Sequence, residues 1–191
     1  MNIIVTPRLL LRPFETADLD EIAALYGDPE VMRFIGVRSR EESAQKLQHM
    51  ISEFSERGFG MFAVIDRREK RFIGRCGIQT LESTGLLELG YTFVKNAWGK
   101  GYATEASKAV LQKAFGEWGL DELVAIAVPE NFASIHVMEK LGMKYDRAET
   151  FYGRYCKLYS IVKKKLTQPS TRPSYEPMKT SALNYRSLGI K

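Results

Sequence analysis

Apolar and polar positions near the start of the chain predict one strand followed by helices. Residues 5–14 are rich in apolar side chains and are expected to form an opening strand. Apolar side chains then recur at positions 19, 22, 23 and 26, which is the spacing of one helix face. Residues 28–36 are interpreted as a short helical piece. A longer helix follows, because Ser39 and Glu42 form an S-x-x-E capping box and Gly58 is a typical C-terminal stop.

The middle of the chain changes to shorter, β-rich segments. Residues 59–65, 71–81 and 86–94 are separated by short polar turns, which predicts an antiparallel meander. Helical spacing returns over residues 102–118, and the apolar run 123–128 is short enough for a buried strand. A strand, a helix and a second strand in this order imply that the two strands are parallel.

The last part of the chain predicts a short helix over residues 131–141 and a hairpin formed by residues 143–151 and 155–163. The order is therefore strand, two helices, three strands, helix, strand, helix and two strands. We expect a mixed α/β (α+β) fold. Its four helices accompany a mostly antiparallel sheet that contains one βαβ crossover and one parallel pair.

Composition separates a domain from a tail. The chain has 191 residues, of which 45% are hydrophobic and 27% charged, as is typical of a globular protein. We interpret residues 1–166 as one domain. Residues 167–191 are rich in Pro and Ser and lack periodicity, so they are expected to form an extended or partner-dependent tail. A second copy of the chain, in a homodimer, is the partner considered for it.

Composition also argues against several kinds of partner. No stretch approaches the roughly 18 consecutive apolar residues of a membrane span, and the N-terminus lacks a secretory signal, so we expect no membrane partner and a cytoplasmic location. Cys76 and Cys156 are too few for a disulfide framework or a zinc site, and no metal is expected. Much of the net charge of +5 falls in residues 167–191. The domain therefore lacks the basic patch that binding to nucleic acid requires.

Residues 94–105 combine a strand end, two glycines one residue apart and a helix start. Glycine permits positive φ and a close approach of the backbone to a ligand. The first N–H groups of a helix have no partner within it, so such a turn suits a phosphate or pyrophosphate. The donors would come from Gly99, Lys100, Gly101, Tyr102, Ala103 and Thr104. A tight turn without a ligand is the alternative interpretation.

Two other phosphate-binding motifs fit this turn less well. A dinucleotide fingerprint requires G-x-G-x-x-G and an acidic residue about 20 residues further on. Here Thr104 occupies the third glycine position, and the acid at the next strand end, Glu130, lies too far along the chain. The Walker motif is absent. A dinucleotide-dependent oxidoreductase remains an alternative that preferential binding of NAD(H) would support.

Three segments of the chain, in the same order, resemble members of the GNAT acetyltransferase superfamily. Asn96–Glu105 is similar to their acetyl-CoA pyrophosphate loop, and Asn131–Met143 resembles the N-x-x-S…KLG segment that follows it. Thr6–Phe14 is similar to the opening strand of the branch that includes the ribosomal-protein N-terminal (alanine/serine) acetyltransferases. The three segments span about residues 5–163. One departure is Asn96, which stands where the family motif begins with Arg or Gln.

This resemblance implies transfer of an acetyl group from acetyl-CoA, the co-substrate, to a primary amine by direct attack, without a metal. It implies a sheet of about seven strands whose parallel pair is splayed for the cofactor. Pantetheine would lie along Phe93 and Val94, and a backbone N–H near Val94 would polarise the thioester carbonyl. A protein N-terminal α-amine is the first expected acceptor, and a small-molecule amine is the second.

Glu88 is the preferred candidate for a catalytic base. A lysine-type amine, with a pKa of about 10.4, needs a base at neutral pH, whereas an α-amine at about 7.7–8.0 needs one less. A carboxylate inside an apolar strand can have the raised pKa that suits proton transfer. A solvated or hydrogen-bonded strand glutamate is the alternative interpretation, and Glu82 is a weaker candidate.

Ser134 is the candidate for donating a proton to the leaving sulfur, and Asn131 for holding the pantetheine amide. Both residues also suit helix capping, which is the alternative interpretation. Many members of the superfamily have a tyrosine acid on this helix, but the matching position here is Met138. Replacements near the last hairpin would be Tyr145, Tyr152 and Tyr155.

The missing tyrosine and Asn96 leave a second function open, namely a non-catalytic acyl-CoA-binding or sensory module. Acyl-CoA binding without turnover of any amine would support it. In the enzyme interpretation, the helices between residues 18 and 56 and the hairpin loop 152–154 are expected to select the acceptor.

Overall fold

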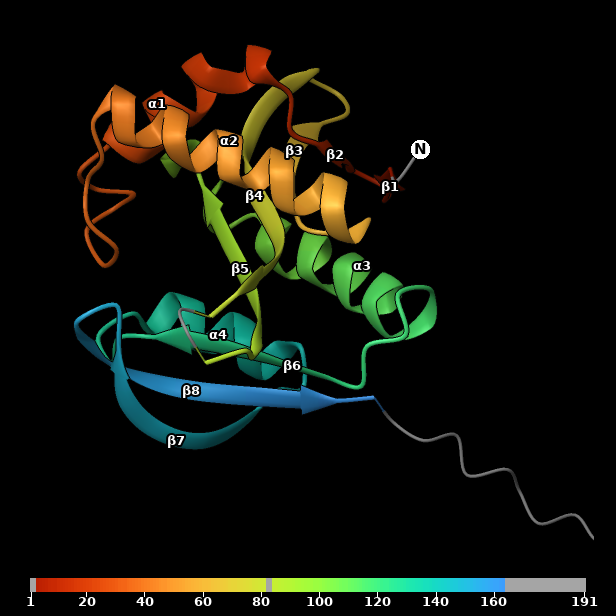
Figure 1. Cartoon of the computed structure of the whole chain (residues 1–191), viewed down its shortest axis with the longest axis vertical. Helices are drawn as coiled ribbons and strands as arrows, with labels where there is room; N and C mark the ends of the chain where they lie inside the picture. The colour runs from red at the N-terminus through yellow and green to blue at the C-terminus, as the bar shows by residue number, and fades with distance from the viewer. Residues whose placement is uncertain (1–2, 82–83, 164–191) are drawn as a thin grey trace, which may run out of the picture.

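The computed structural model describes residues 3–81 and 84–163, which form a twisted sheet with helices on both faces (Figure 1). The strands are β1 (Ile4–Val5), β2 (Leu9–Pro13), β3 (Met61–Asp66), β4 (Arg71–Thr80), β5 (Leu87–Phe93), β6 (Glu122–Ala127), β7 (Lys144–Phe151) and β8 (Arg154–Val162). The helices are α1 (Leu19–Gly27), α2 (Arg40–Arg57), α3 (Tyr102–Gly116) and α4 (Phe132–Lys140), with short 3-10 turns η1 (Thr16–Asp18) and η2 (Lys95–Ala97).

The sheet confirms the predicted mixed topology. Its eight strands in the described residues follow the order β1-β2-β3-β4-β5-β6-β8-β7, and every neighbouring pair is antiparallel except β5 and β6. The extra strand arises because the opening segment divides into β1 and β2, with Pro7 between them. Residues 29–35 form turns, so the expectation of a short helical piece there is wrong.

The parallel pair is held together at a single register position. Glu88 of β5 pairs with Val124 of β6, and no other pair joins these two strands. Figure 1 shows the consequence, because β6 and β8 run at a wide angle to β5. The sheet is therefore split into two halves that remain joined at one end of β5.

Separate apolar cores lie on the two faces of the sheet. One contains Ile22 and Leu25 of α1 with Leu47 and Met50 of α2. The other contains the buried side of α3 and of α4 packed under β4, β5 and β6. The predicted tail, residues 167–191, lies outside the described residues, so its interpretation and the homodimer stay predictions.

Helix α2 begins and ends as its sequence predicts. The Ser39 hydroxyl accepts a hydrogen bond from the Glu42 N–H at 3.2 Å, and the Glu42 carboxylate accepts one from the Ser39 N–H at 2.7 Å. At the other end Gly58 adopts the left-handed conformation, with φ of 74°. These caps position the helix that covers the face of β4 and β5 described below.

Replacing the capping hydroxyl should weaken the domain measurably. Ser39→Ala is expected to lower the free energy of unfolding by about 1 kcal/mol, because the Glu42 N–H loses its acceptor. Urea denaturation followed by circular dichroism measures this. Ser55→Ala on the exposed side of the same helix is the matched control and should change stability by less than about 0.5 kcal/mol. Equal effects of the two substitutions would contradict the capping role.

Candidate active site

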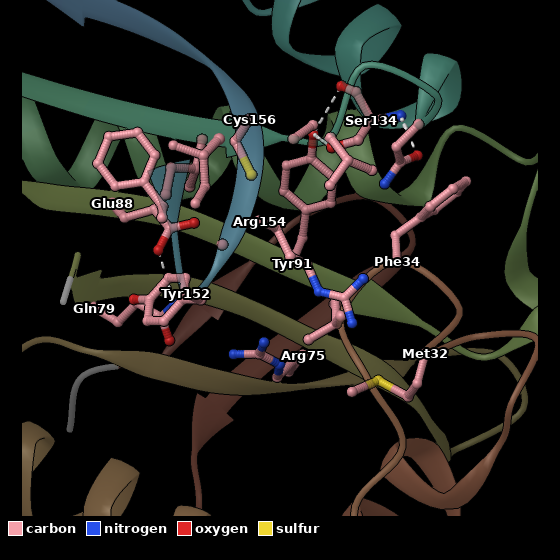
Figure 2. A pocket seen from close by; sticks show the side chains of 18 of the residues that line it. Met32, Phe34, Arg75, Gln79, Glu88, Tyr91, Ser134, Tyr152, Arg154 and Cys156 are labelled. Atoms are coloured by element: carbon pink, nitrogen blue, oxygen red, sulfur yellow. Dashed lines mark hydrogen bonds between the residues drawn. The ribbon is translucent and has the colours of Figure 1, made fainter. Parts of the chain in front are cut away.

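A cavity of about 220 Å³ opens where β5 and β6 separate. Its walls come from α1, the segment that follows it, α2, β4, β5, β6, α4 and the β7–β8 hairpin. Figure 2 shows Glu88 and Gln79 at one side, Met32 and Phe34 at the other, and Arg75 and Arg154 between them. The separation of two strands thus gives this cavity access to side chains from both faces of the sheet.

The floor of the cavity is formed by pairs of residues on β4 and β5. In-register pairs that share the face toward α1 are Arg75–Thr92, Gly77–Gly90 and Gln79–Glu88. The middle pair has no side chains, and of its two glycines only Gly90 lines the cavity. A Cβ at Gly90 would have no neighbour closer than 3.8 Å, whereas one at Gly77 would clash with backbone of Gly60 and Met61. The sheet therefore requires glycine at one of these positions and tolerates a side chain at the other.

Glu88, the predicted base, is buried in this floor. The residue is only 7% exposed, and the Gln79 amide donates a hydrogen bond to Oε2 at 2.9 Å. Burial raises the pKa of Glu88 above its usual value, although the Gln79 hydrogen bond and the positive charges of Arg75 and Lys46 oppose that rise. A buried carboxyl group with a raised pKa, lying in a cavity, has the character of a proton acceptor.

Ser134, the predicted acid, meets a tyrosine that lies on the opposite face of β5 from Glu88. The Tyr91 hydroxyl donates to the Ser134 carbonyl at 3.0 Å and lies 3.0 Å from Ser134 Oγ. Asn131 Oδ1 accepts a hydrogen bond from the Ser134 N–H at 3.2 Å, so the capping role of Asn131 is present. Tyr91, Ser134 and Asn131 all line the cavity. Glu88 and a chain of hydroxyl groups therefore face one space.

The other candidate acids separate into one that lines the cavity and two that do not. Tyr152 lines it and has a positive φ of 50°. Tyr145 and Tyr155 are 55% and 62% exposed and do not line it, and Tyr145 packs against Tyr159. Met138, at the position of the family tyrosine, is buried in the wall. Tyr91 was missed by the sequence reasoning because alternation directs it to the other face of its strand.

The glycine turn has the backbone shape expected of an anion-binding loop. Gly99 and Gly101 have φ of 71° and 78°, and α3 begins directly afterwards at Tyr102. The N–H of Glu105 donates to the Gly101 carbonyl at 3.0 Å. The N–H groups of Tyr102, Ala103 and Thr104 precede this bond and have no partner within the helix. A Cβ at Gly99 would meet nothing within 4 Å, so the loop is open on that side.

The start of α3 is fastened to the N-terminal strands by groups that the sequence reasoning did not single out. Glu105 accepts hydrogen bonds from the Thr6 hydroxyl at 2.6 Å, from the Arg8 N–H at 3.1 Å and from Arg8 Nε at 2.6 Å. Arg8 Nη1 also donates to the Lys100 carbonyl at 2.9 Å, and its guanidinium lies 4.5 Å from the Tyr102 ring centroid. Arg8 thus holds Lys100 through its backbone carbonyl and Tyr102 through its ring.

The predicted oxyanion donor, a backbone N–H near Val94, is not the N–H of Val94 itself. That N–H donates to the Ile73 carbonyl at 3.0 Å and is not free to polarise a thioester carbonyl. Phe93 is buried in the core, its carbonyl accepts a bond from the Trp98 indole at 2.8 Å, and neither Phe93 nor Val94 lines the cavity. Beyond Glu88, however, the edge of β5 that faces β6 has lost its partner strand. Alternate N–H groups along that edge point into the gap.

The metal-ligating side chains and the two cysteines show no further catalytic arrangement in the part of the chain that the structure describes. Within the described ranges no three His, Cys, Asp or Glu side chains gather as a metal site, and no helix there has the length and apolarity of a membrane span. Cys76 is fully buried beside Ser107, and burial raises the pKa of its thiol to about 12. Cys156 is also buried, in the cavity wall.

Comparison with known proteins identifies the family. A model of the acetyltransferase (GNAT) domain matches residues 8–144. YkkB of Bacillus subtilis (strain 168) is 35% identical over 150 residues, which cover 75% of this chain and 86% of YkkB. YnaD of the same strain, named an N-acetyltransferase, is 34% identical over 143 residues, which cover 74% of this chain and 82% of YnaD. A GNAT-family acetyltransferase from Bacillus anthracis superposes with a TM-score of 0.72 at 28% identity, over 84% of this chain and 98% of that one.

The chain therefore belongs to the GNAT acetyltransferase family, and it is an acyltransferase. The resemblance to the ribosomal-protein branch is confirmed at the level of the fold. RimL, a ribosomal L7/L12 α-N-protein acetyltransferase solved with coenzyme A, superposes with a TM-score of 0.71 over 84% of this chain and 98% of its own, at 18% identity.

Two polar residues of β4, the buried Arg75 and the half-buried Gln79, were also missed by the sequence reasoning. Both interrupt the otherwise apolar run Phe72–Ile78 and its continuation. A charged residue in the middle of a buried strand is rarely left without a reason, since Arg is seldom fully buried unless paired. That rule applied to Arg75 would have placed a polar site on this face of the sheet.

The Glu105 contacts should make stability depend on pH. Burial disfavours the ionised carboxylate, but the hydrogen bonds from Thr6 and Arg8 outweigh it and hold the pKa of Glu105 below its usual value. A lowered pKa contributes stability above the unfolded-state pKa, and this stability is lost as pH falls through the folded-state pKa. Glu105→Gln is therefore expected to cost about 1–2 kcal/mol at pH 7 and progressively less toward pH 3.

Urea denaturation at a series of pH values measures this difference. Glu117→Gln is the control, because Glu117 caps the other end of α3 in an exposed pair with Lys113 and should contribute less than about 1 kcal/mol. A loss in Glu105→Gln that is independent of pH would show that its charge is not responsible.

Proposed function

We propose that this acyltransferase moves an acetyl group from acetyl-CoA to a primary amine by direct attack of the amine on the thioester. The observation that carries the proposal is the cavity between β5 and β6, which has a buried carboxyl group on one side and hydrogen-bonded hydroxyl groups on the other. A reaction that removes a proton from an amine and delivers one to a thiolate needs groups of these two kinds.

The backbone around the glycine turn would hold the cofactor. Free N–H groups from Gly99 to Thr104 suit the pyrophosphate, and the positive end of the α3 dipole adds to their attraction. The Oδ1 atom of Asn131 is used in capping, which leaves its Nδ2 to donate to a pantetheine carbonyl. When bound, acetyl-CoA supplies the activated acyl group. The coenzyme A complex of RimL, which has the same fold, supports this use of the site.

The proposed proton transfers balance across the cavity. The amine nitrogen forms a bond to the carbonyl carbon as the carbon–sulfur bond breaks, and Glu88 accepts the proton that the amine loses. Ser134 delivers a proton toward the departing sulfur, and the Tyr91 hydroxyl holds the Ser134 hydroxyl through their 3.0 Å contact. Solvent returns the proton from Glu88 to Ser134 after the products leave. An N–H on the unpaired edge of β5 would stabilise negative charge on the carbonyl oxygen.

A protein N-terminal α-amine is the first acceptor proposed, and a small-molecule amine is the second. RimL is named for acetylating a protein α-amine, and its shared fold supports the first. The small volume of the cavity, about 220 Å³, means that only the end of a polypeptide or a small molecule could enter. The acceptor class proposed is therefore a primary amine on a small molecule or at the end of a polypeptide.

The pH dependence of acetylation should identify the base. Because burial raises the pKa of Glu88, kcat/KM for a lysine-type amine is expected to rise with pH through an acidic limb above the usual glutamate range. Glu88→Gln should remove that limb and lower kcat by about 10²–10⁴-fold. The release of coenzyme A from acetyl-CoA, detected through its free thiol, measures both quantities.

Glu122→Gln, at an exposed position on β6, serves as the control and should leave the profile unchanged. Binding of acetyl-CoA with no turnover of any amine, in the parent protein as in Glu88→Gln, would instead support a non-catalytic acyl-CoA-binding module.

A side chain at Gly101 should weaken coenzyme A binding. Gly101→Ala forces a Cβ into a left-handed backbone and into the turn that presents the free N–H groups, so the Kd measured by calorimetry is expected to rise at least about tenfold. Gly119→Ala carries the same backbone strain, at φ of 68° and in open space beyond the far end of α3, and is the matched control. Equal Kd values for the two variants would remove the loop from the binding site.

A further inference from the structure

We propose that the acceptor amine carries a carboxylate group and that Arg75 binds it within the cavity. This inference rests on the proposed function, because it names the class of amine that the site accepts. Arg75 projects from β4 on the same face as Glu88, the proposed base. Arg75 would therefore contact the acceptor amine and not the coenzyme, whose phosphates would lie at the start of α3.

Arg75 has unused hydrogen-bonding capacity in a buried position. The residue is only 7% exposed, and its Nε and Nη1 atoms have no hydrogen-bond partner among the described residues. The guanidinium lies 5.4 Å from the ring centroid of Tyr26, and no carboxylate of the described chain forms an ion pair with it within 4 Å. A buried cation in this condition is costly to the folded state unless a ligand pairs with it.

The unsatisfied polar atoms of the described chain gather at this one place. Buried side-chain nitrogen and oxygen atoms without partners are found on four residues, and three of these line the cavity while the fourth pairs with Arg75 across the strands. Buried polar groups normally have partners, so a cluster of exceptions points to a missing polar ligand. The atoms are Tyr26 Oη, Arg75 Nε and Nη1, Gln79 Oε1 and Thr92 Oγ1.

The charges around the cavity favour an anion. Glu88 is the only carboxylate among the residues that line it, whereas four cationic side chains do so. These are Arg38, Lys46, Arg75 and Arg154. An amine without an anionic group would enter a cavity whose net charge repels it. A carboxylate on the same molecule removes that penalty and gives the acceptor a fixed orientation.

The geometry favours a carboxylate at some distance from the amine. A guanidinium presents two flat pairs of donors that match the two oxygens of a carboxylate, and the unpartnered Nε and Nη1 of Arg75 each belong to one such pair together with Nη2. Arg75 and Glu88 lie two cross-strand pairs apart, with the empty Gly77–Gly90 pair between them. Four residues of strand span about 13 Å, of which the long arginine side chain covers a part. The part of the cavity next to Gly90 would hold the atoms that connect the amine to its carboxylate.

Matched pairs of acceptors test the proposal. The kcat/KM for acetylation is measured with glycine, β-alanine, γ-aminobutyrate and glycylglycine, and with the carboxamide of each. At least one carboxylate is expected to exceed its amide by about 10- to 100-fold, as one charge-assisted pair implies. O-phosphoethanolamine is included as a different oxyanion, and a preference for it over every carboxylate would overturn the assignment.

Variants then attribute the preference to Arg75. Arg75→Gln should bring the ratio of kcat/KM for each carboxylate to that for its carboxamide down to about one, and Arg75→Lys should retain part of the preference. Arg147→Gln is the control, because Arg147 lies on β7 in exposed ion pairs and does not line the cavity. Succinyl-CoA tests the alternative that Arg75 binds a carboxylate on the acyl donor. A preference for succinyl over acetyl transfer that depends on Arg75 would support this alternative and overturn the proposal.

Failure of this inference is distinguishable from failure of the proposed function. If each amino acid and its carboxamide are acetylated at equal rates, the carboxylate inference is overturned and the acetyltransferase function stands. If no amine is acetylated, the proposed function fails, and calorimetry with the same amino acids still decides the inference. Saturable binding that Arg75→Gln removes would support it, and no binding at millimolar concentration would overturn it.

Thermal unfolding without ligand separates a binding role from a structural one. Removing an unpaired buried cation should leave the Tm of Arg75→Gln unchanged or raised. A fall of more than about 5 °C would identify Arg75 as a structural residue and overturn the proposal.

Discussion

The site depends on one constraint, which is that β5 and β6 are parallel neighbours joined by a single register pair, Glu88 with Val124. A sheet normally continues its ladder of hydrogen bonds along the whole strand. Here the two strands diverge, and the backbone groups and side chains beyond the last pair face a space instead of a partner. Groups on opposite faces of β5, such as Glu88 and Tyr91, can therefore act on one molecule, which a continuous sheet would prevent.

The polar floor beneath α1 and α2 has a cost that the rest of the domain must offset. Burying Glu88 and Arg75 removes two charges from water, and Arg75 is not repaid by an ion pair of its own. The two apolar cores, one on each face of the sheet, supply the opposing free energy. The apolar residues of α1 and α2 stabilise the fold, whereas the polar residues of β4 and β5 beneath these helices form the site.

Local patterns predicted the elements and the glycine loop well, because helix spacing, capping residues and positive-φ glycines act within a few residues of sequence. The order of strands, the parallel pair and the cap of α2 follow from such signals. Contacts between distant segments do not. The Val94 N–H is used by Ile73, Tyr91 reaches Ser134, and Glu105 binds the N-terminal strands. Each depends on how far one element lies from another, and periodicity carries no information about that distance.

The empty pair on the cavity floor has a consequence for how acceptor preference could diverge within this fold. Of its two glycines, only Gly90 has room for a side chain, since a Cβ at Gly77 would collide with the neighbouring strand. Small residues at position 90 would therefore shorten the space between base and arginine without disturbing the backbone. A single site on β5 would then act as a length gauge, which natural variation or protein engineering could adjust one methylene at a time.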